Sequence, residues 1–531
     1  MHRIFGLVCF VVLICSCSTE ESEEKNQAID KTFLTDSKLS GKEKLQKALA
    51  FPYLKSLGMN EAQQQAVNTF YEANSFNFQL FKGDSLTRLG QKAYDCMNEP
   101  LQFGIPRNRI LPLQESHHWI ENELILACNL LTAAGILKNG LLDYENKLTK
   151  PTIPLDGKEF HLQLKQLDTI SLAKLLIKQG PTDTNYRFIA DHLYDYCQRV
   201  SIDTHQFVLK SKKEDTLNFE KNIRECLIQK GFLTNKSSKQ EFNSAIKQFK
   251  KLSGFNEDNR IDEATIQALN ESTLNKVKRI ALALDKLRQP RKTDKKYVIV
   301  NLPSFELFFY ADDTLRSRNR IIIGKTTNQT PQLKASINRI VCHPFWKVPQ
   351  SIADKEILPA VKANSRYLST NHYRIYRGKN EINPTTVNWK RYKKNFPYTV
   401  IQDPGPHNSL GIIKLEFYNS FSVYVHDTPT KSLFRRGYRS FSHGCMRCEN
   451  PVELAKTILD FDSISPRNRN VYTRDSIDSI LYRAVNFSIP LKRSIPIYVE
   501  YITVSATRDN LFLHLDLYKR DDEYLNLMFG S

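Results

Sequence analysis

The hydrophobic pattern of the chain changes near residue 295, and this change limits the folds available to it. Before residue 290 apolar residues recur at three- and four-residue spacing, as in HHWIENELILACNLLTAAGIL, where Ile120, Leu124, Cys128 and Leu131 would share one helix face. After Lys295 the spacing becomes two, which is typical of strands. We therefore expect an α+β multidomain fold with a helical N-terminal scaffold and a β-rich C-terminal part.

The first residues indicate export from the cytoplasm. His2 and Arg3 precede an apolar run over residues 4–14, which is too short to cross a bilayer and is typical of a signal-peptide core. The segment around Cys17 resembles a bacterial lipoprotein signal. This predicts a signal peptide over 1–17, lipidation of Cys17 and a membrane-held chain. An ordinary secretory signal is the alternative.

The charge balance favours anionic partners, since the chain has a formal net charge of +19. Export makes nucleic acid an unexpected partner and leaves the membrane surface or an acidic envelope polymer. We expect the protein at the cell envelope, facing the periplasm and anchored by lipid to a membrane. Of the two membranes, we favour the outer one. Residues 18–44 are polar and poor in aromatic residues, which predicts a flexible tether.

The helical half divides into three predicted parts. Residues 45–210 form a helical scaffold, which could grip a substrate or partner or could be a packed domain without chemistry. Residues 215–272 contain three helices, two closed by Gly231 and Gly254 and the third capped by Asp262. Residues 273–294 form a connecting helix that stops at Pro290. The three-helix unit resembles the peptidoglycan-binding module of cell-wall enzymes; a degenerate spacer is the alternative.

The stretch SFSHGCMRCEN places Cys445 in a loop ahead of a helix. Asn450 would be the N-cap of that helix, and Glu453 would complete a capping box. His426 ends a predicted strand in FSVYVHDTP. A histidine lowers a cysteine pKa from its usual value of about 8.5, and a glycine-containing turn offers N–H donors to an oxyanion. These parts indicate a nucleophilic cysteine.

Together the two stretches resemble the signature of L,D-transpeptidases with a YkuD-like catalytic domain. The resemblance extends to the large subfamily that joins a helical scaffold and a peptidoglycan-binding-like module to this domain. Two further stretches carry it: HPFWKVPQSIADKEILP and QDPGPHNSLGIIKLEFYNSFSVYVHDTPTKSLF. The resemblance implies a β-rich sandwich over residues 295–520 with its active site at one edge. A capping segment would span about residues 343–410.

The resemblance also implies roles for matching residues. Cys445 would attack the peptidoglycan stem peptide between its third residue, a diamino acid, and the terminal D-alanine, while His426 acts as base and then acid. The oxyanion hole would be made by the backbone N–H groups of His443, Gly444 and Cys445. The substrate-binding residues would be Arg447, Tyr424 and Trp346. Core packing is the alternative for Trp346.

The expected product is a 3→3 cross-link, formed when the diamino-acid amine of another stem resolves the thioester. No cofactor is expected, and carbapenems should acylate the same thiol. If water resolves the thioester, the enzyme is an L,D-carboxypeptidase; if a protein lysine does, it anchors an envelope protein to peptidoglycan. A non-catalytic wall-binding lipoprotein is the alternative of a different class.

Cys448 completes a Cys-x-x-Cys pair with Cys445. A zinc site would need two further ligands at matching spacing, and a thioredoxin-like centre would need a βαβ context. Neither is present in the sequence, so no metal is expected. Two interpretations of Cys448 remain: a buried packing thiol, or a thiol that resolves an oxidised Cys445.

Overall fold

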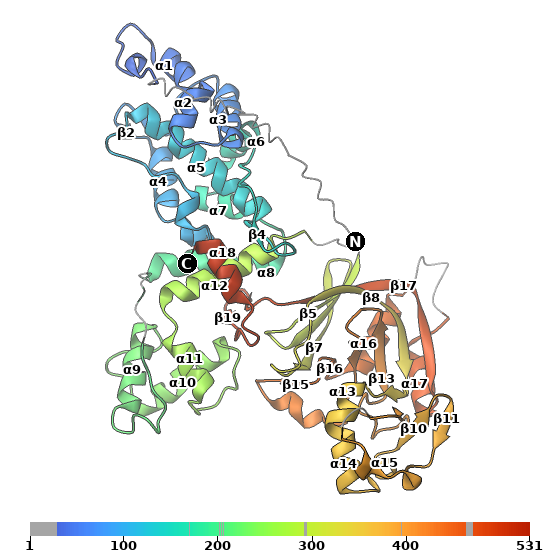
Figure 1. Cartoon of the computed structure of the whole chain (residues 1–531). Helices are drawn as coiled ribbons and strands as arrows, with labels where there is room; N and C mark the ends of the chain where they lie inside the picture. Colours follow the sequence, from blue (N-terminus) through green and yellow to red (C-terminus); the bar gives the residue numbers. More distant parts are fainter. Residues whose placement is uncertain are drawn as a thin grey trace, which may run out of the picture.

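The computed structural model describes residues 29–530 apart from 169, 201, 203, 205–206, 291–294, 394–395 and 463–470. Helices fill the N-terminal part and strands the part drawn in yellow to orange (Figure 1). The predicted α+β multidomain arrangement is confirmed. The predicted signal peptide and Cys17 lie outside the described residues.

The scaffold is built around one long apolar helix, α5 (Trp119–Asn139). This helix is long and apolar enough to cross a membrane, but 94% of its most apolar 18-residue stretch is buried inside the fold. Its composition therefore suits the centre of a helical core. The helices around it are α1 (Gly41–Ala48), α2 (Phe51–Ser56), α3 (Glu61–Ala73), α4 (Arg88–Asn98), α6 (Gly157–Leu164), α7 (Leu172–Ile177) and α8 (Thr184–Arg199). Two short hairpins complete it: β1 (Phe81–Lys82) with β2 (Ser85–Leu86), and β3 (Leu142–Asp143) with β4 (Leu148–Thr149).

Part of the segment predicted as a tether is folded onto this scaffold. Phe33 and Leu34 are buried in the scaffold core. Lys31 forms an ion pair with Glu121 of α5 at 2.6 Å. The prediction of a flexible tether over 18–44 is therefore wrong for residues 31–44, because two apolar side chains dock an otherwise polar stretch.

The three-helix module forms as its sequence predicts, with α9 (Phe219–Gln229), α10 (Lys239–Leu252) and α11 (Glu263–Asn270). Gly231 and Gly254 have φ values of +77° and +72°, the left-handed conformation that ends helices. Asp262 accepts a hydrogen bond from the Thr265 N–H as the N-cap of α11. The module has its own core and continues into α12 (Thr273–Leu287).

The β-rich part is one nine-stranded sheet in the order β15-β7-β16-β14-β13-β8-β17-β5-β6, and β6 also pairs with β7. The sheet therefore returns on itself and encloses a single core. Its strands are β5 (Lys296–Asn301), β6 (Glu306–Ala311), β7 (Thr314–Gly324), β8 (Leu333–Cys342), β13 (Ile413–Phe417), β14 (Val425–His426), β15 (Ser440–Ser442), β16 (Met446–Cys448) and β17 (Phe487–Glu500).

The helix after the cysteine motif, α16 (Pro451–Asp460), forms where expected and packs in this core. Its predicted capping is wrong: the Asn450 side chain makes no cap hydrogen bond, and Glu453 instead pairs with Arg474 at 2.6 Å. Arg474 opens α17 (Arg474–Tyr482), so the carboxylate joins two helices.

A segment between β8 and β13 forms a separate small body. It has a four-stranded sheet of β11 (Asn380–Ile382), β10 (Tyr373–Arg377), β12 (Thr399–Gln402) and β9 (Trp346–Lys347), and the helices α13 (Gln350–Ile352), α14 (Leu358–Ala363) and α15 (Tyr367–Thr370). It has its own hydrophobic core. We call residues 343–410 the capping segment.

The end of the chain returns to the scaffold instead of extending the sheet. After β17 comes a hairpin of β18 (Val504–Ala506) and β19 (Leu511–Leu513), followed by α18 (Asp521–Phe529), drawn in red in Figure 1. Val504 and Met528 lie in the scaffold core, while Tyr501 and Tyr518 lie in the sheet core. The catalytic domain is predicted to end at residue 520. The last segment instead packs on both the scaffold core and the sheet core, so residue 520 is not a boundary between them.

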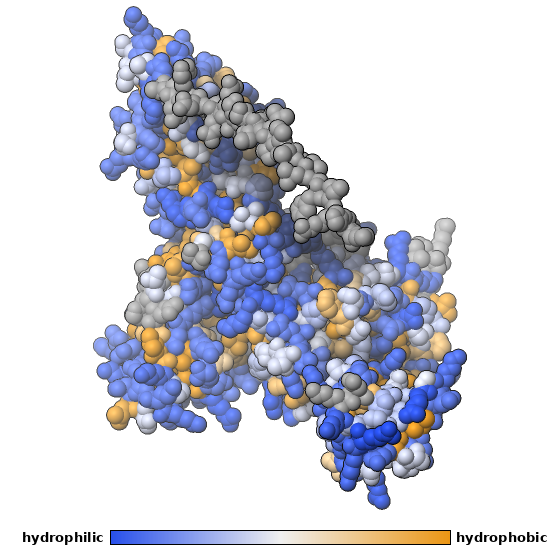
Figure 2. Space-filling view, viewed as in Figure 1, coloured by the Kyte–Doolittle hydropathy of each residue, from blue (hydrophilic) through white to orange (hydrophobic). Residues whose placement is uncertain are grey.

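Most of the face seen in Figure 2 is hydrophilic, with hydrophobic residues in small separate groups. Scattered surface apolar residues of this kind are ordinary in folded proteins. The large apolar side chains are gathered in the cores.

A substitution at Gly135 of α5 would test how tightly the scaffold is packed. Alanine in mid-helix is ordinarily more favourable than glycine by about 1 kcal/mol. A Cβ at Gly135 would lie 2.0 Å from the carbonyl oxygen of Ile153 and 2.7 Å from Cα of Pro154. We expect Gly135→Ala to destabilise the protein by about 1–3 kcal/mol, seen as a lower midpoint of urea unfolding. An equal or higher midpoint would mean that helix propensity prevails.

Candidate active site

The pairing of β14 with β16 brings the two sequence motifs together. The strands are parallel, with Val425 opposite Met446 and His426 opposite Arg447. The Met446 N–H donates to the Tyr424 carbonyl oxygen at 3.0 Å. Cys445, just ahead of β16, therefore lies beside Tyr424 at the same edge as His426.

The Cys445 thiol is held by hydrogen bonds. Its sulfur accepts from the backbone N–H and from the hydroxyl of Tyr424. The Trp346 indole N–H donates in turn to the Tyr424 oxygen. Trp346 also packs against Tyr373 in the capping segment, with ring centres 6.4 Å apart. The tryptophan thus belongs to the capping core and also reaches the thiol through one tyrosine.

His426 is buried beside the same tyrosine, with ring centres 5.5 Å apart. Its Nδ1 hydrogen bonds the Asp427 carbonyl oxygen, which can only accept, so Nδ1 carries a proton. The backbone of Leu410 also interacts with the imidazole. Burial, and then the Arg447 cation, lower the pKa of His426 to about 3. The imidazole is therefore neutral at physiological pH and can act as a base.

Burial raises the pKa of Cys445 above its usual range. The two hydrogen bonds from Tyr424 and the cations of Arg447 and Lys414 oppose this rise. The sequence predicts a thiol pKa lowered by histidine, and this is wrong for the free enzyme, because desolvation outweighs the nearby donors and cations. The thiol and the imidazole are therefore both uncharged at neutral pH.

The loop that carries Cys445 is fixed on both sides. Ser442 Oγ donates to the Cys445 carbonyl oxygen at 2.6 Å and accepts from the Gly444 N–H at 3.2 Å. Thr330 Oγ1 donates to the Gly444 carbonyl oxygen at 2.8 Å. Gly444 has φ +118°, which residues with a side chain rarely adopt.

These bonds bear on the predicted oxyanion hole. The Gly444 N–H is engaged by Ser442. In the part of the chain that the structure describes, no hydrogen bond uses the N–H of His443 or of Cys445. Two of the three predicted donors are therefore available in this conformation.

Two charged residues near the thiol were not predicted. Glu356, in the π-helical turn Ala353–Ile357 of the capping segment, accepts from His443 Nε2 at 2.5 Å. The Lys414 ammonium lies 4.9 Å from the centre of the Tyr424 ring. No motif singles out either residue, and only strand pairing and the capping contact bring them close. Arg447 is partly buried beside them, and burial lowers its pKa.

Cys448 lies fully buried in the sheet core, and burial raises its pKa to about 12. This agrees with the packing interpretation, since oxidation favours accessible thiolates. No group of three or more His, Cys, Asp or Glu side chains suited to a metal ion lies within the described ranges.

The fold and site define a β-rich domain with a cysteine and a histidine at one sheet edge. Residues 295–469 match the family model of the YkuD L,D-transpeptidase catalytic domain. This part of the chain is therefore similar to the catalytic domain of L,D-transpeptidases.

A curated protein of Haemophilus influenzae named "Putative L,D-transpeptidase" is 29% identical over 225 residues, or 42% of this chain and 44% of that protein. The chain thus covers less than half of this relative's length. An L,D-transpeptidase from Mycobacterium smegmatis aligns at 13% identity over 39% of this chain and 58% of that one, with a TM-score of 0.18. This superposition is too weak to bear on the overall fold.

The tyrosine contact can be tested by thiol reactivity. The Tyr424 hydrogen bond favours the thiolate of Cys445, so Tyr424→Phe should raise the thiol pKa further. We expect the pH profile of iodoacetamide alkylation of Cys445 to move to higher pH, with slower alkylation at pH 8. Tyr376→Phe, which removes an exposed hydroxyl bonded to Glu381, is the matched control and should leave the profile in place. A profile unchanged by Tyr424→Phe would show that the contact does not tune the thiol.

Proposed function

We propose that the protein is a peptidoglycan L,D-transpeptidase that forms 3→3 cross-links through a thioester on Cys445. The observation that carries the proposal is the placement of Cys445 beside Tyr424 and His426 within a domain that matches the L,D-transpeptidase family. The positive net charge suits an acidic wall polymer.

In the first half-reaction the Cys445 sulfur attacks the carbonyl carbon of the third stem residue. The thiol proton passes to Nε2 of His426, and the N–H groups of His443 and Cys445 stabilise the oxyanion. The bond to the terminal D-alanine then breaks, and His426 returns the proton to the departing amine. A thioester and free D-alanine result.

In the second half-reaction a diamino-acid amine of another stem attacks the thioester. His426 takes a proton from that amine and gives it to the sulfur as the new amide bond forms. Arg447 and Lys414 supply positive charge near the thiol, which suits substrates that carry carboxylates. Trp346 and Glu356 bring the capping segment over the same site.

Removal of the sulfur tests the proposal. Purified protein is incubated with disaccharide tetrapeptide, and products are separated by mass. We expect 3→3 dimers and free D-alanine from the native chain and neither from Cys445→Ala. Cys197→Ala, in the scaffold, is the matched control and should keep activity. Dimers made by Cys445→Ala would refute the assigned nucleophile.

The same reaction separates the alternatives. Tripeptide without dimers would indicate an L,D-carboxypeptidase, and activity only with a lysine-bearing envelope protein would indicate protein anchoring. Binding without any turnover would indicate the non-catalytic wall-binding lipoprotein. A carbapenem should add its mass once to the native chain and not to Cys445→Ala.

We further propose that Cys17 is lipidated and holds the protein at a membrane on the periplasmic side. The support is the sequence alone: an apolar run of signal-peptide length ends shortly before this cysteine. We expect Cys17→Ser protein to leave the membrane fraction after a high-salt wash, because several acyl chains anchor firmly and none would remain. Retention of that variant in washed membranes would count against lipidation.

A further inference from the structure

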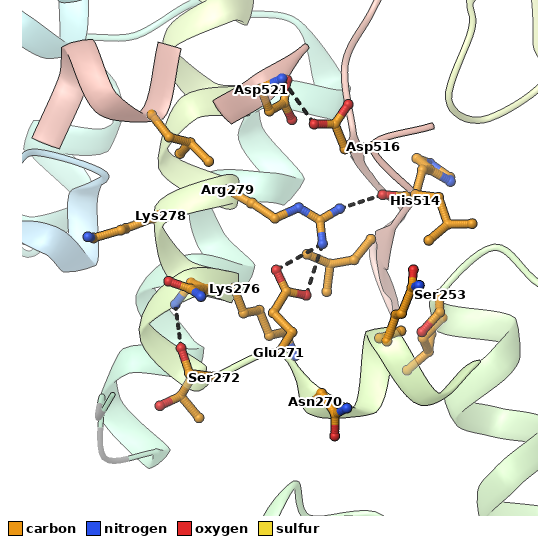
Figure 3. Close-up of a pocket in the computed structure, with 18 of the residues that line it drawn as sticks. Ser253, Asn270, Glu271, Ser272, Lys276, Lys278, Arg279, His514, Asp516 and Asp521 are labelled. Atoms are coloured by element: carbon orange, nitrogen blue, oxygen red, sulfur yellow. Dashed lines mark hydrogen bonds and ion pairs between the residues drawn. The ribbon is translucent and has the colours of Figure 1, made fainter. Parts of the chain in front are cut away.

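A cavity of about 700 Å³ lies between the three-helix module, the start of α12 and the last segment of the chain (Figure 3). Its walls include Ser253, Asn270, Lys276, Arg279, His514 and Phe529. None of the residues assigned to the active site lines it. Its volume falls within the range of about 300–1,000 Å³ that is usual for small-molecule sites.

Three of the carboxylates on these walls are already satisfied. Glu271 binds the Arg279 guanidinium at 2.9 Å. Asp521 binds Lys286 at 2.5 Å, and Asp516 accepts from the Tyr501 hydroxyl at 2.7 Å. Asp522, the remaining one, is exposed to solvent. Glu271 and Asp521 are therefore each paired with a cation, and Asp516 is held by hydrogen bonds.

Some cationic side chains on the described cavity wall have nitrogen atoms that lack an ion-pair or hydrogen-bond partner. Within the described residues Lys276 forms no ion pair and no hydrogen bond through its ammonium, which lies 4.5 Å from the centre of the Tyr196 ring. Burial lowers the pKa of Lys276 to about 8. The Nε atom of Arg279 is buried without a hydrogen-bond partner. The N-terminus of α12, at Ser272, adds the positive end of a helix dipole.

The rest of the wall suits a peptide. The amide side chain of Gln267 can pair with a peptide group. Phe249, Leu513 and Phe529 provide apolar surface for side chains. A site with an unpaired cation, an amide group and apolar walls matches a short peptide that ends in a carboxylate.

We propose that this cavity binds the free carboxylate end of a peptide, with the carboxylate paired to Lys276. The site is separate from Cys445, and its occupancy does not depend on acyl transfer. Because the module, α12 and the last segment all contribute walls, a bound peptide would also stabilise their packing against one another.

The test uses the full chain with Cys445→Ala, so that no turnover occurs. Calorimetric titration compares disaccharide tetrapeptide with the same compound amidated at its C-terminus. We expect the carboxylate form to bind at least about tenfold more tightly, since a partly buried charge pair is lost on amidation. Lys276→Gln should remove this difference, and Lys276→Arg should restore part of it.

Lys247→Gln is the matched control, since it removes an exposed lysine of α10 that does not line the cavity. It should keep the full difference between the two ligands. The unfolding midpoint of each variant shows whether the fold is intact. Equal affinities for the two ligands, an unchanged difference in Lys276→Gln, or no binding at millimolar ligand would each overturn the proposal. None of these outcomes bears on whether Cys445 forms a thioester.

Discussion

The candidate active site depends on one tertiary interaction, the parallel pairing of β14 with β16. Two very short strands that lie apart in the sequence are aligned so that His426 faces Arg447 across the ladder and Tyr424 lies beside Cys445. A slip of one residue would send these side chains to opposite faces of the sheet. The bonds of Ser442 and Thr330 to the cysteine loop and the pairing of β16 with β7 protect this register.

Burial sets the electrostatics of the site and opposes its activation. Desolvation raises the pKa of the Cys445 thiol and lowers the pKa of the His426 imidazole, so both are neutral before substrate binds. The hydrogen bonds of Tyr424 and the cations of Lys414 and Arg447 reduce the cost of forming the thiolate. Under the proposed mechanism, the proton would therefore move from the thiol to the imidazole during attack.

The last segment of the chain explains how the parts are joined. It leaves the sheet core after Tyr501, enters the scaffold core at Ile502 and returns to the sheet core at Tyr518. The buried ion pair between Lys286 and Asp521 fixes α18 on α12. The cavity beside Lys276 exists because this segment closes the space between α12 and the module.

The sequence by itself determined the local elements and the chemical motif. Helical periodicity located α5 and the helices of the module, and the His426 and Cys445 stretches indicated the family, because both signals are written in neighbouring residues. Only the tertiary structure decided that Phe33 packs on the scaffold, that Tyr424 contacts the thiol and Trp346 contacts Tyr424, and that Glu356 pairs with His443. It also decided the direction of the Cys445 pKa shift. These features depend on burial and on contacts between residues far apart in the chain, which no local pattern encodes.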